Sequence, residues 1–157
     1  MSPSSRLPAF PGCPSTTANV IRGTSAANRI TATSRADRIF ALGGNDSVDG
    51  LAGNDCVNLG AGADRARGGA GADLILGASG NDRIAGDAGA DTLRGAAGND
   101  RISGGPGRDR ISGGAGRDRI SARDRARDRI DCGSGRDSVT ADRIDVVARN
   151  CERVRRF

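Results

Sequence analysis

Aspartate recurs at every ninth position through the middle of this 157-residue chain, without a slip over ten units. Carboxylates stacked one strand spacing apart repel one another unless a cation lies between them. Carboxylate and backbone carbonyl oxygens, without nitrogen or sulfur, form the ligand set of a hard cation, and several flexible oxygen ligands favour Ca²⁺ over Mg²⁺. The spacing therefore predicts cation chemistry at these positions: Asp37, Asp46, Asp55, Asp64, Asp73, Asp82, Asp91, Asp100, Asp109 and Asp118.

The composition excludes most catalytic chemistry. The chain has no His, so a Ser-His-Asp triad, a Cys-His pair and a His-ligated zinc or haem site are all excluded. It also has no Lys, Trp or Tyr, only 3 Phe, and 25 Gly. A chain this polar and this rich in glycine is expected to be disordered unless something other than hydrophobic burial holds it together. We therefore predict that the protein is not an enzyme.

The nine-residue spacing also predicts the elements that position the aspartates. An apolar residue follows two places after each aspartate, as Ile75 follows Asp73, and this half of the unit is too short for anything but a strand. The glycine-rich half, such as residues 68–72, predicts a turn. Strand, turn, strand and turn make one coil of two repeat units. Stacked coils predict an all-β solenoid of two parallel sheets with Ile and Val between them, about six coils and roughly 30 Å long.

The repeat divides the chain into three parts. Residues 1–13 form an irregular leader with several prolines, and residues 14–121 form the repeat solenoid. Ala122 reads as a one-residue insertion, after which the spacing falters, so residues 122–157 are predicted to be degenerate repeats and a C-terminal cap. The sequence predicts no membrane span and shows no signal-peptide pattern, and we expect the true start to lie upstream of Met1.

The unit Gly-Gly-x-Gly-x-Asp-x-apolar-x resembles the calcium-binding nonapeptide of the haemolysin-type (RTX) repeat family. Residues 68–73, 104–109 and 113–118 match it in full, and the resemblance covers roughly residues 14–140. It implies a parallel β-roll in which several Ca²⁺ ions lie between successive turns, held by the sixth-position aspartate and by turn carbonyls. Carried over to this chain, the aspartate ligands are Asp46, Asp55, Asp64, Asp73, Asp82, Asp91, Asp100, Asp109 and Asp118. The glycines of the full matches are Gly68, Gly71, Gly104, Gly107, Gly113 and Gly116.

The resemblance implies a non-catalytic calcium-binding module that folds or becomes rigid as it binds Ca²⁺. The alternative is a calcium-free solenoid whose aspartates cap turns or pair with arginine. Arg108 and Arg110 flank Asp109 directly, for example, and a guanidinium beside a carboxylate can take the place of a cation. The first hypothesis predicts that folding depends on Ca²⁺, and the alternative predicts that it does not.

Two of the four cysteines have the spacing of a disulfide. Cys132 and Cys151 are about one coil apart in the sequence, which brings their Cα atoms close to the separation that a disulfide needs. We predict that this pair closes the terminal coil. Cys13 and Cys56 lie more than two coils apart and can pair only if the leader folds back, so their state stays open. A disulfide and calcium sites both favour an oxidising setting, extracellular or in the cell envelope.

The charge is uneven along the chain. Residues 1–100 hold 9 Arg and 10 Asp, whereas residues 101–157 hold 15 Arg and 9 acidic residues. Four arginines, each separated from the next by two repeat units, should form a column on one outer face: Arg65, Arg83, Arg101 and Arg119.

The arginine column suggests a second functional hypothesis, a metal-independent solenoid that binds anionic cell-surface polymers or serves a structural role. The other interpretation is a solvated face whose arginine stems cover the backbone. Because no aromatic stacking residue accompanies the arginines, we predict no specific nucleic-acid binding. We expect a monomer.

Overall fold

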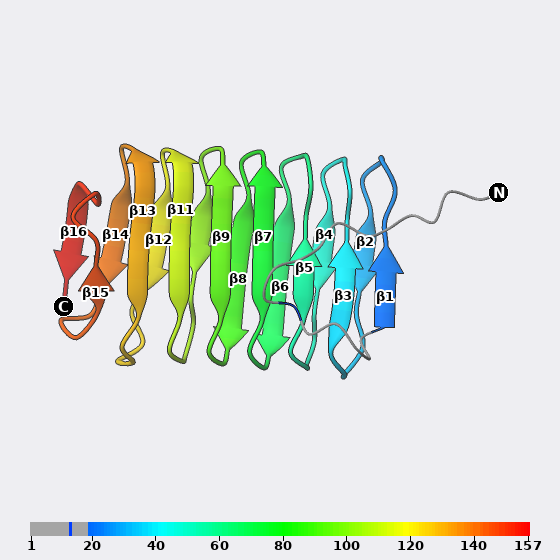
Figure 1. Cartoon of the computed structure of the whole chain (residues 1–157), viewed down its shortest axis with the longest axis horizontal. Coiled ribbons are helices and arrows are strands. Elements are labelled where there is room, and N and C mark those ends of the chain that lie inside the picture. The colour runs from blue at the N-terminus through cyan, green and yellow to red at the C-terminus, as the bar shows by residue number, and fades with distance from the viewer. Residues whose placement is uncertain (1–12, 14–18) are drawn as a thin grey trace.

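The computed structural model describes residue 13 and residues 19–157. It consists of two parallel sheets of eight strands each, which form a β-solenoid (Figure 1). The described residues contain no helix, and the prediction of an all-β parallel β-roll is confirmed. The first sheet holds, in spatial order, β1 (Asn19–Arg22), β3 (Asp37–Phe40), β5 (Cys56–Asn58), β7 (Leu74–Ser79), β9 (Thr92–Ala97), β11 (Arg110–Gly116), β13 (Arg129–Gly135) and β15 (Val146–Val147). The second sheet holds β2 (Arg29–Thr31), β4 (Ser47–Asp49), β6 (Arg65–Ala70), β8 (Arg83–Ala88), β10 (Arg101–Ser103), β12 (Arg119–Ala122), β14 (Ser138–Ala141) and β16 (Arg153–Arg156).

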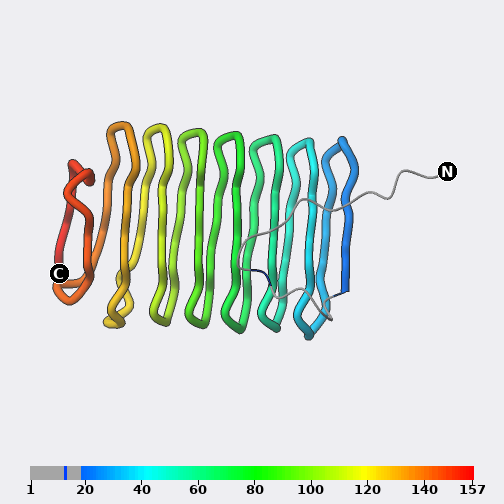
Figure 2. The backbone as a smooth tube through the Cα atoms, in the orientation of Figure 1, coloured from blue at the N-terminus to red at the C-terminus, as the bar shows by residue number. Residues whose placement is uncertain are grey.

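The chain winds alternately between the two sheets, one strand at a time (Figure 2). Each strand pairs in parallel with the strand two places along the chain, as β7 pairs with β9, where Ile75 lies opposite Leu93. One coil in the regular part of the chain therefore consists of two repeat units. Since both units of a coil have the same sequence pattern, like residues come to lie above one another at both edges of the solenoid.

The core between the sheets is thin. From β2 to β14, each strand contributes one apolar residue to a central row between the sheets, and the exposed fraction of these side chains is at most 7%. Some strands and turns bury a further apolar residue beside this row, such as Leu59, Ala122 and Cys132. Burying one such aliphatic side chain stabilises the fold by about 1.5–3 kcal/mol, and Ala66 contributes least. The inward residues are Ile30, Ile39, Val48, Val57, Ala66, Ile75, Ile84, Leu93, Ile102, Ile111, Ile120, Ile130 and Val139.

The turns need backbone conformations and space that glycine provides. Gly71 has a φ of 142°, and a Cβ there would overlap the carbonyl oxygen of Gly53 in the preceding coil. The second position of the unit is also left-handed, with a φ of 107° at Gly114. Ala96 occupies the equivalent position with a φ of 77°, a conformation that costs a residue with a side chain about 1–2 kcal/mol.

The irregular C-terminal part of the chain continues both sheets. β13 pairs with β11, and β14, β15 and β16 each pair with a preceding strand of the same sheet. The sheets therefore have eight strands each, more than the roughly six coils expected from the regular units, because the degenerate units also form strands. The division of the chain into leader, solenoid and cap stays a prediction, and residues 1–12 and 14–18 lie outside the described residues.

Two disulfides tie the solenoid together. Cys132 in β13 is bonded to Cys151, with Cα atoms 5.2 Å apart, which is the pairing that the spacing predicts. Cys13 is bonded to Cys56 in β5, with Cα atoms 5.9 Å apart, which answers the question that the sequence left open. No helix in the described part of the chain is long and apolar enough to span a membrane.

Candidate functional site

The repeat aspartates form two columns, one at each edge of the solenoid, where each turn enters a strand. All of them are buried, with at most 5% of the residue exposed. The column that precedes the strands of the first sheet contains Asp37, Asp55, Asp73, Asp91, Asp109, Asp128 and Asp145. The column that precedes the strands of the second sheet contains Asp46, Asp64, Asp82, Asp100, Asp118 and Asp137.

From Asp46 onward, one oxygen of each carboxylate links adjacent coils. Oδ1 of Asp73 accepts a hydrogen bond from the backbone N–H of Asp55 at 2.8 Å, and Oδ1 of Asp91 accepts one from the N–H of Asp73 at 2.9 Å. The same bond recurs along both columns with lengths of 2.7–3.0 Å. The bond persists where one extra residue enters the coil, from Asp109 to Asp128. The first carboxylate oxygen therefore has a structural partner.

The second oxygen has no hydrogen-bond partner among the described residues, although it is buried. A buried carboxylate oxygen without a partner is costly, so it favours a proton or a cation beside it. Eleven aspartates have this unpaired Oδ2: Asp46, Asp55, Asp64, Asp73, Asp82, Asp91, Asp100, Asp109, Asp118, Asp128 and Asp137.

The unpaired oxygen lies beside a glycine and a backbone carbonyl. A Cβ on Gly68 would meet both Oδ2 of Asp73 and the carbonyl oxygen of Gly86, one coil further along. Gly86 has the same relationship to Asp91 and to the carbonyl of Gly104. Carboxylate and carbonyl oxygens thus lie close together beside a glycine that has no side chain to hold them apart, and this donor set suits a hard cation such as Ca²⁺.

Seven of the unpaired aspartates have a glycine at this first turn position, and in each of these units Oδ2 lies against that glycine. A carbonyl oxygen of the next coil lies beside the same glycine in every unit except that of Asp109. The seven aspartates are Asp55, Asp73, Asp82, Asp91, Asp100, Asp109 and Asp118. In the units of Asp46, Asp64 and Asp137 a side chain stands there instead, from Ala41, Leu59 and Cys132. The glycine pattern therefore distinguishes two kinds of turn within the columns.

No three His, Cys, Asp or Glu side chains in the described part of the chain lie close enough to hold a metal ion together. A cation in a turn would therefore depend on backbone carbonyls for most of its ligands. The glycines at the fourth position of the unit offer such oxygens: a Cβ added to Gly89 or Gly135 would overlap the carbonyl oxygen of Gly71 or Gly116 in the preceding coil. This balance of ligands fits Ca²⁺, which accepts carbonyl oxygens readily.

Burial raises the pKa of several carboxyls in the columns toward neutral pH. Burial raises the pKa of Asp82 to about 7, against the lowering effect of the hydrogen bond from the Asp64 amide. It also raises the pKa of Asp128 to about 7. The pKa of five further carboxyls rises to about 6 for the same reason: Asp55, Asp73, Asp91, Asp109 and Asp118. In the absence of a cation, the folded state therefore disfavours the ionised carboxylates.

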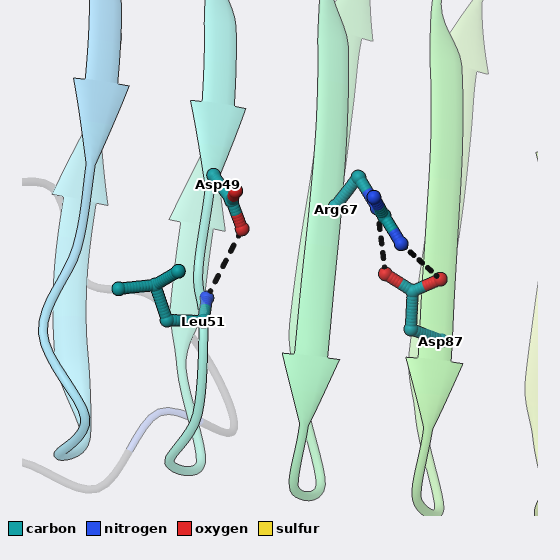
Figure 3. A network of polar contacts seen from close by, with 4 residues as sticks. All are labelled: Asp49, Leu51, Arg67 and Asp87. Carbon is teal, nitrogen blue, oxygen red and sulfur yellow. Dashed lines mark hydrogen bonds and ion pairs between the residues drawn. The ribbon is translucent and has the colours of Figure 1, made fainter.

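Arginine does not neutralise the columns. The one ion pair among the described residues joins Arg67 to Asp87 at 2.9 Å on the outer face of the second sheet (Figure 3). Arg108 and Arg110 flank Asp109 in sequence, yet Oδ2 of Asp109 has no partner among the described residues. The unpaired oxygens are therefore not occupied by the neighbouring guanidinium groups.

A second, shorter ladder was not anticipated from the sequence. Oδ1 of Asn54 accepts a hydrogen bond from the N–H of Ala72, one coil later, at 2.9 Å. Asn99 makes the same bond with Arg117 at 2.7 Å, so these amides point along the stack in the opposite direction to the aspartates. The signal was the recurring Asn-Asp pair. The four asparagines are Asn45, Asn54, Asn81 and Asn99.

The fold and the site together define a repeat β-roll in whose turns carboxylate and carbonyl oxygens lie close together. The chain matches the RTX calcium-binding nonapeptide repeat family in four copies, over residues 22–56, 31–66, 58–93 and 85–120. The protein belongs to this family, as the resemblance of its glycine and aspartate spacing indicates. A comparison with curated proteins gives no match.

Proposed function

We propose that this chain is a non-catalytic module that binds several Ca²⁺ ions at its turns, and that it folds or becomes rigid as they bind. The observation that carries the proposal is the unpaired, buried Oδ2 on eleven stacked aspartates. A proton leaves such an oxygen as the pH rises through the raised pKa values of about 6 to 7, whereas a hard cation can stay beside the ionised carboxylate above them.

The proposed ligands are the aspartates of the columns together with turn carbonyls. The nine aspartates from Asp46 to Asp118 supply the carboxylates, and glycines such as Gly68, Gly71, Gly104, Gly107, Gly113 and Gly116 leave the backbone accessible. Bound Ca²⁺ would supply positive charge between like-charged coils. Among these turns, the seven with a first-position glycine let Oδ2 approach the backbone more closely than a side chain would allow, and we propose that they bind most tightly.

Binding and folding are coupled in this proposal because the remaining stabilisation is small. The core is one central row of apolar residues with a few more beside it, while the ordering of each residue costs about 1–2 kcal/mol in backbone entropy. The ionised columns oppose folding further. A ligand that binds only the folded turns shifts this balance by mass action.

We infer an extracellular or cell-envelope setting for the module. Two disulfides are stable in an oxidising compartment. Calcium sites of extracellular modules have dissociation constants of roughly 10⁻⁴–10⁻³ M, so they would be empty at cytosolic calcium levels. We expect the module to act as a monomer there.

Far-UV circular dichroism of chelator-treated protein during a Ca²⁺ titration tests this function, with Mg²⁺ as the control. We expect a gain of β signal, or of thermal stability if the fold already exists, that is specific to Ca²⁺ and half complete at roughly 0.1–1 mM. A spectrum and a melting temperature that do not change with Ca²⁺ would contradict the proposal.

A further inference from the structure

The outer face of the second sheet carries four adjacent arginines at the first position of its strands, in the middle of a longer row. The strand register places Arg65 beside Arg83, Arg83 beside Arg101, and Arg101 beside Arg119. The row continues to Ser47 and Arg29 at one end and to Ser138 and Arg153 at the other. All eight residues are exposed, and none of them is acidic.

The four central arginines have no ion pair or side-chain hydrogen bond within the described part of the chain. The contrast is Arg67, two residues after Arg65, whose guanidinium reaches Asp87 on the neighbouring strand β8 (Figure 3). Like charges stacked one strand spacing apart, about 4.8 Å, repel one another. The row is therefore a surface whose charge is left without a counterpart inside the molecule.

Small hydroxyl side chains lie beside the C-terminal part of the basic row, from Arg101 onward, whereas Arg67 and Ala85 stand at the same place beside Arg65 and Arg83. Two residues further along the strands, Ser103 lies beside Ser121, and Ser121 lies beside Thr140. Ser103 and Ser121 are exposed. These hydroxyl groups can exchange hydrogen bonds with neutral hydroxyl groups of a ligand. No aromatic side chain stands in either row, so bases of a single-stranded nucleic acid would find no stacking surface there.

The basic row leads into a groove at the C-terminal end of the solenoid. Four arginines line this groove, together with Ser138 and three acidic residues: Arg117, Arg119, Arg136 and Arg153, with Asp118, Asp137 and Glu152. The carboxylate of Glu152 accepts a hydrogen bond from the N–H of Asp137 at 2.8 Å, as the last member of its column. The groove thus extends the basic surface beyond β12.

We propose that this row binds a linear polysaccharide that carries carboxylate or sulfate groups. Guanidinium groups pair with such oxyanions in a planar, two-bond geometry, and the strand register presents one guanidinium per coil along a straight line. The adjacent hydroxyl row contacts the sugar hydroxyls between the charges. The spacing of the row comes from strand pairing, so the proposal does not depend on where Ca²⁺ binds.

The test measures the binding of three fluorescently labelled polymers of equal length by fluorescence anisotropy: dextran sulfate, carboxymethyl-dextran and neutral dextran. The buffer is near physiological salt and contains about 1 mM Ca²⁺, the concentration that fills extracellular sites. The variant Arg83→Gln/Arg101→Gln removes two charges from the middle of the row. The matched control, Arg94→Gln/Arg110→Gln, removes two exposed charges from β9 and β11 in the other sheet. Circular dichroism checks that both variants keep the β spectrum.

We expect the wild type to bind at least one charged dextran and not the neutral one. The row variant should weaken that binding about tenfold and the control variant by less than about threefold, because charge-assisted hydrogen bonds are lost only in the first. An equal loss of affinity in both variants would show that binding depends only on the net charge of the protein, and would overturn the proposal. Failure to bind either charged dextran would also overturn it, as would tighter binding of single-stranded DNA of the same charge.

Discussion

The backbone N–H of Asp55 donates a hydrogen bond to Oδ1 of Asp73 at 2.8 Å, while Oδ2 of the same carboxylate is buried and has no partner among the described residues. One side chain therefore has two roles: one oxygen joins adjacent coils, and the other remains for a proton or a cation. Every turn from Asp46 to Asp137 in the columns repeats this division.

Asp73→Asn separates the two roles. The amide keeps Oδ1 for the Asp55 N–H, and its NH₂ group can donate to the carbonyl of Gly86. We expect the chelator-treated variant to be more stable at pH 8, by on the order of 1 kcal/mol, since a buried polar atom gains a partner and loses its charge. Its stabilisation by Ca²⁺ should decrease. Urea unfolding with and without Ca²⁺ measures both effects.

The control for this substitution is Asp49→Asn. Asp49 lies on the outer face, where its Oδ1 accepts a hydrogen bond from the Leu51 N–H at 3.3 Å (Figure 3). The Asp49→Asn substitution also removes one negative charge, but outside the columns, and it should leave the response to Ca²⁺ unchanged. If the two variants lost the same part of the calcium response, the columns would not be the binding site.

The raised carboxyl pKa values predict an unusual pH dependence for the metal-free protein. The pKa of Asp82 and Asp128 is about 7 when folded, whereas the ordinary value of an aspartate is 3.8. Below about pH 4 these carboxyls are protonated in both the folded and the unfolded state, so folding does not bury an ionised carboxylate. Between there and pH 7 only the folded state retains these protons, so stability is lost as the pH rises through the folded pKa.

Thermal melts in chelator from pH 4 to pH 8 should therefore show a melting temperature that decreases across this range. With excess Ca²⁺ the trend should flatten or reverse, because a cation needs the ionised carboxylates. A metal-free melting temperature that increased steadily from pH 5 to pH 8 would contradict the account of unpaired, buried oxygens.

Much of this arrangement can be predicted from the nine-residue period. Because Ile75 and Leu93 are two repeat units apart, the spacing alone places them on adjacent strands, and the aspartates follow into columns. The split between the two carboxylate oxygens cannot be predicted, since it depends on the distance from each side chain to the next coil. The Cys13–Cys56 disulfide is equally out of reach, because it depends on the path of a non-repeating segment.

The backbone conformation of the turns predicts that two substitutions at equivalent positions have opposite effects on stability. Ala96 has a φ of 77°, and Gly114, the equivalent residue one coil later, has a φ of 107°. We expect Ala96→Gly to stabilise the protein by up to about 1 kcal/mol, after the entropy cost of glycine is subtracted from the relieved strain. Gly114→Ala should destabilise it, because the added Cβ would overlap the carbonyl oxygen of Ala96.

Denaturant midpoints of the two variants in saturating Ca²⁺ test this pair of effects. A stability increase from Gly114→Ala would show that the turn does not need the left-handed conformation at this position.

The Cys132–Cys151 disulfide predicts that the stability of the C-terminal coil depends on oxidation of this pair. It joins β13 to the segment before β16 across a sequence separation of 19. Closing a loop of this length stabilises a fold by about 3 kcal/mol in the chain-entropy description. The double variant Cys132→Ser/Cys151→Ser should lower the melting temperature by several degrees, and a reducing agent should have no further effect through this bond. An unchanged melting temperature would contradict a stabilising role.

Equilibrium dialysis against Ca²⁺ tests the central claim most directly, because it counts bound ions without relying on a folding signal. At about 1 mM free Ca²⁺ we expect the wild-type chain to retain several ions, Asp49→Asn to retain as many, and Asp73→Asn/Asp91→Asn to retain fewer. Retention of no Ca²⁺ by the wild type, or of equal numbers by all three proteins, would contradict the assignment of the aspartate columns as calcium sites.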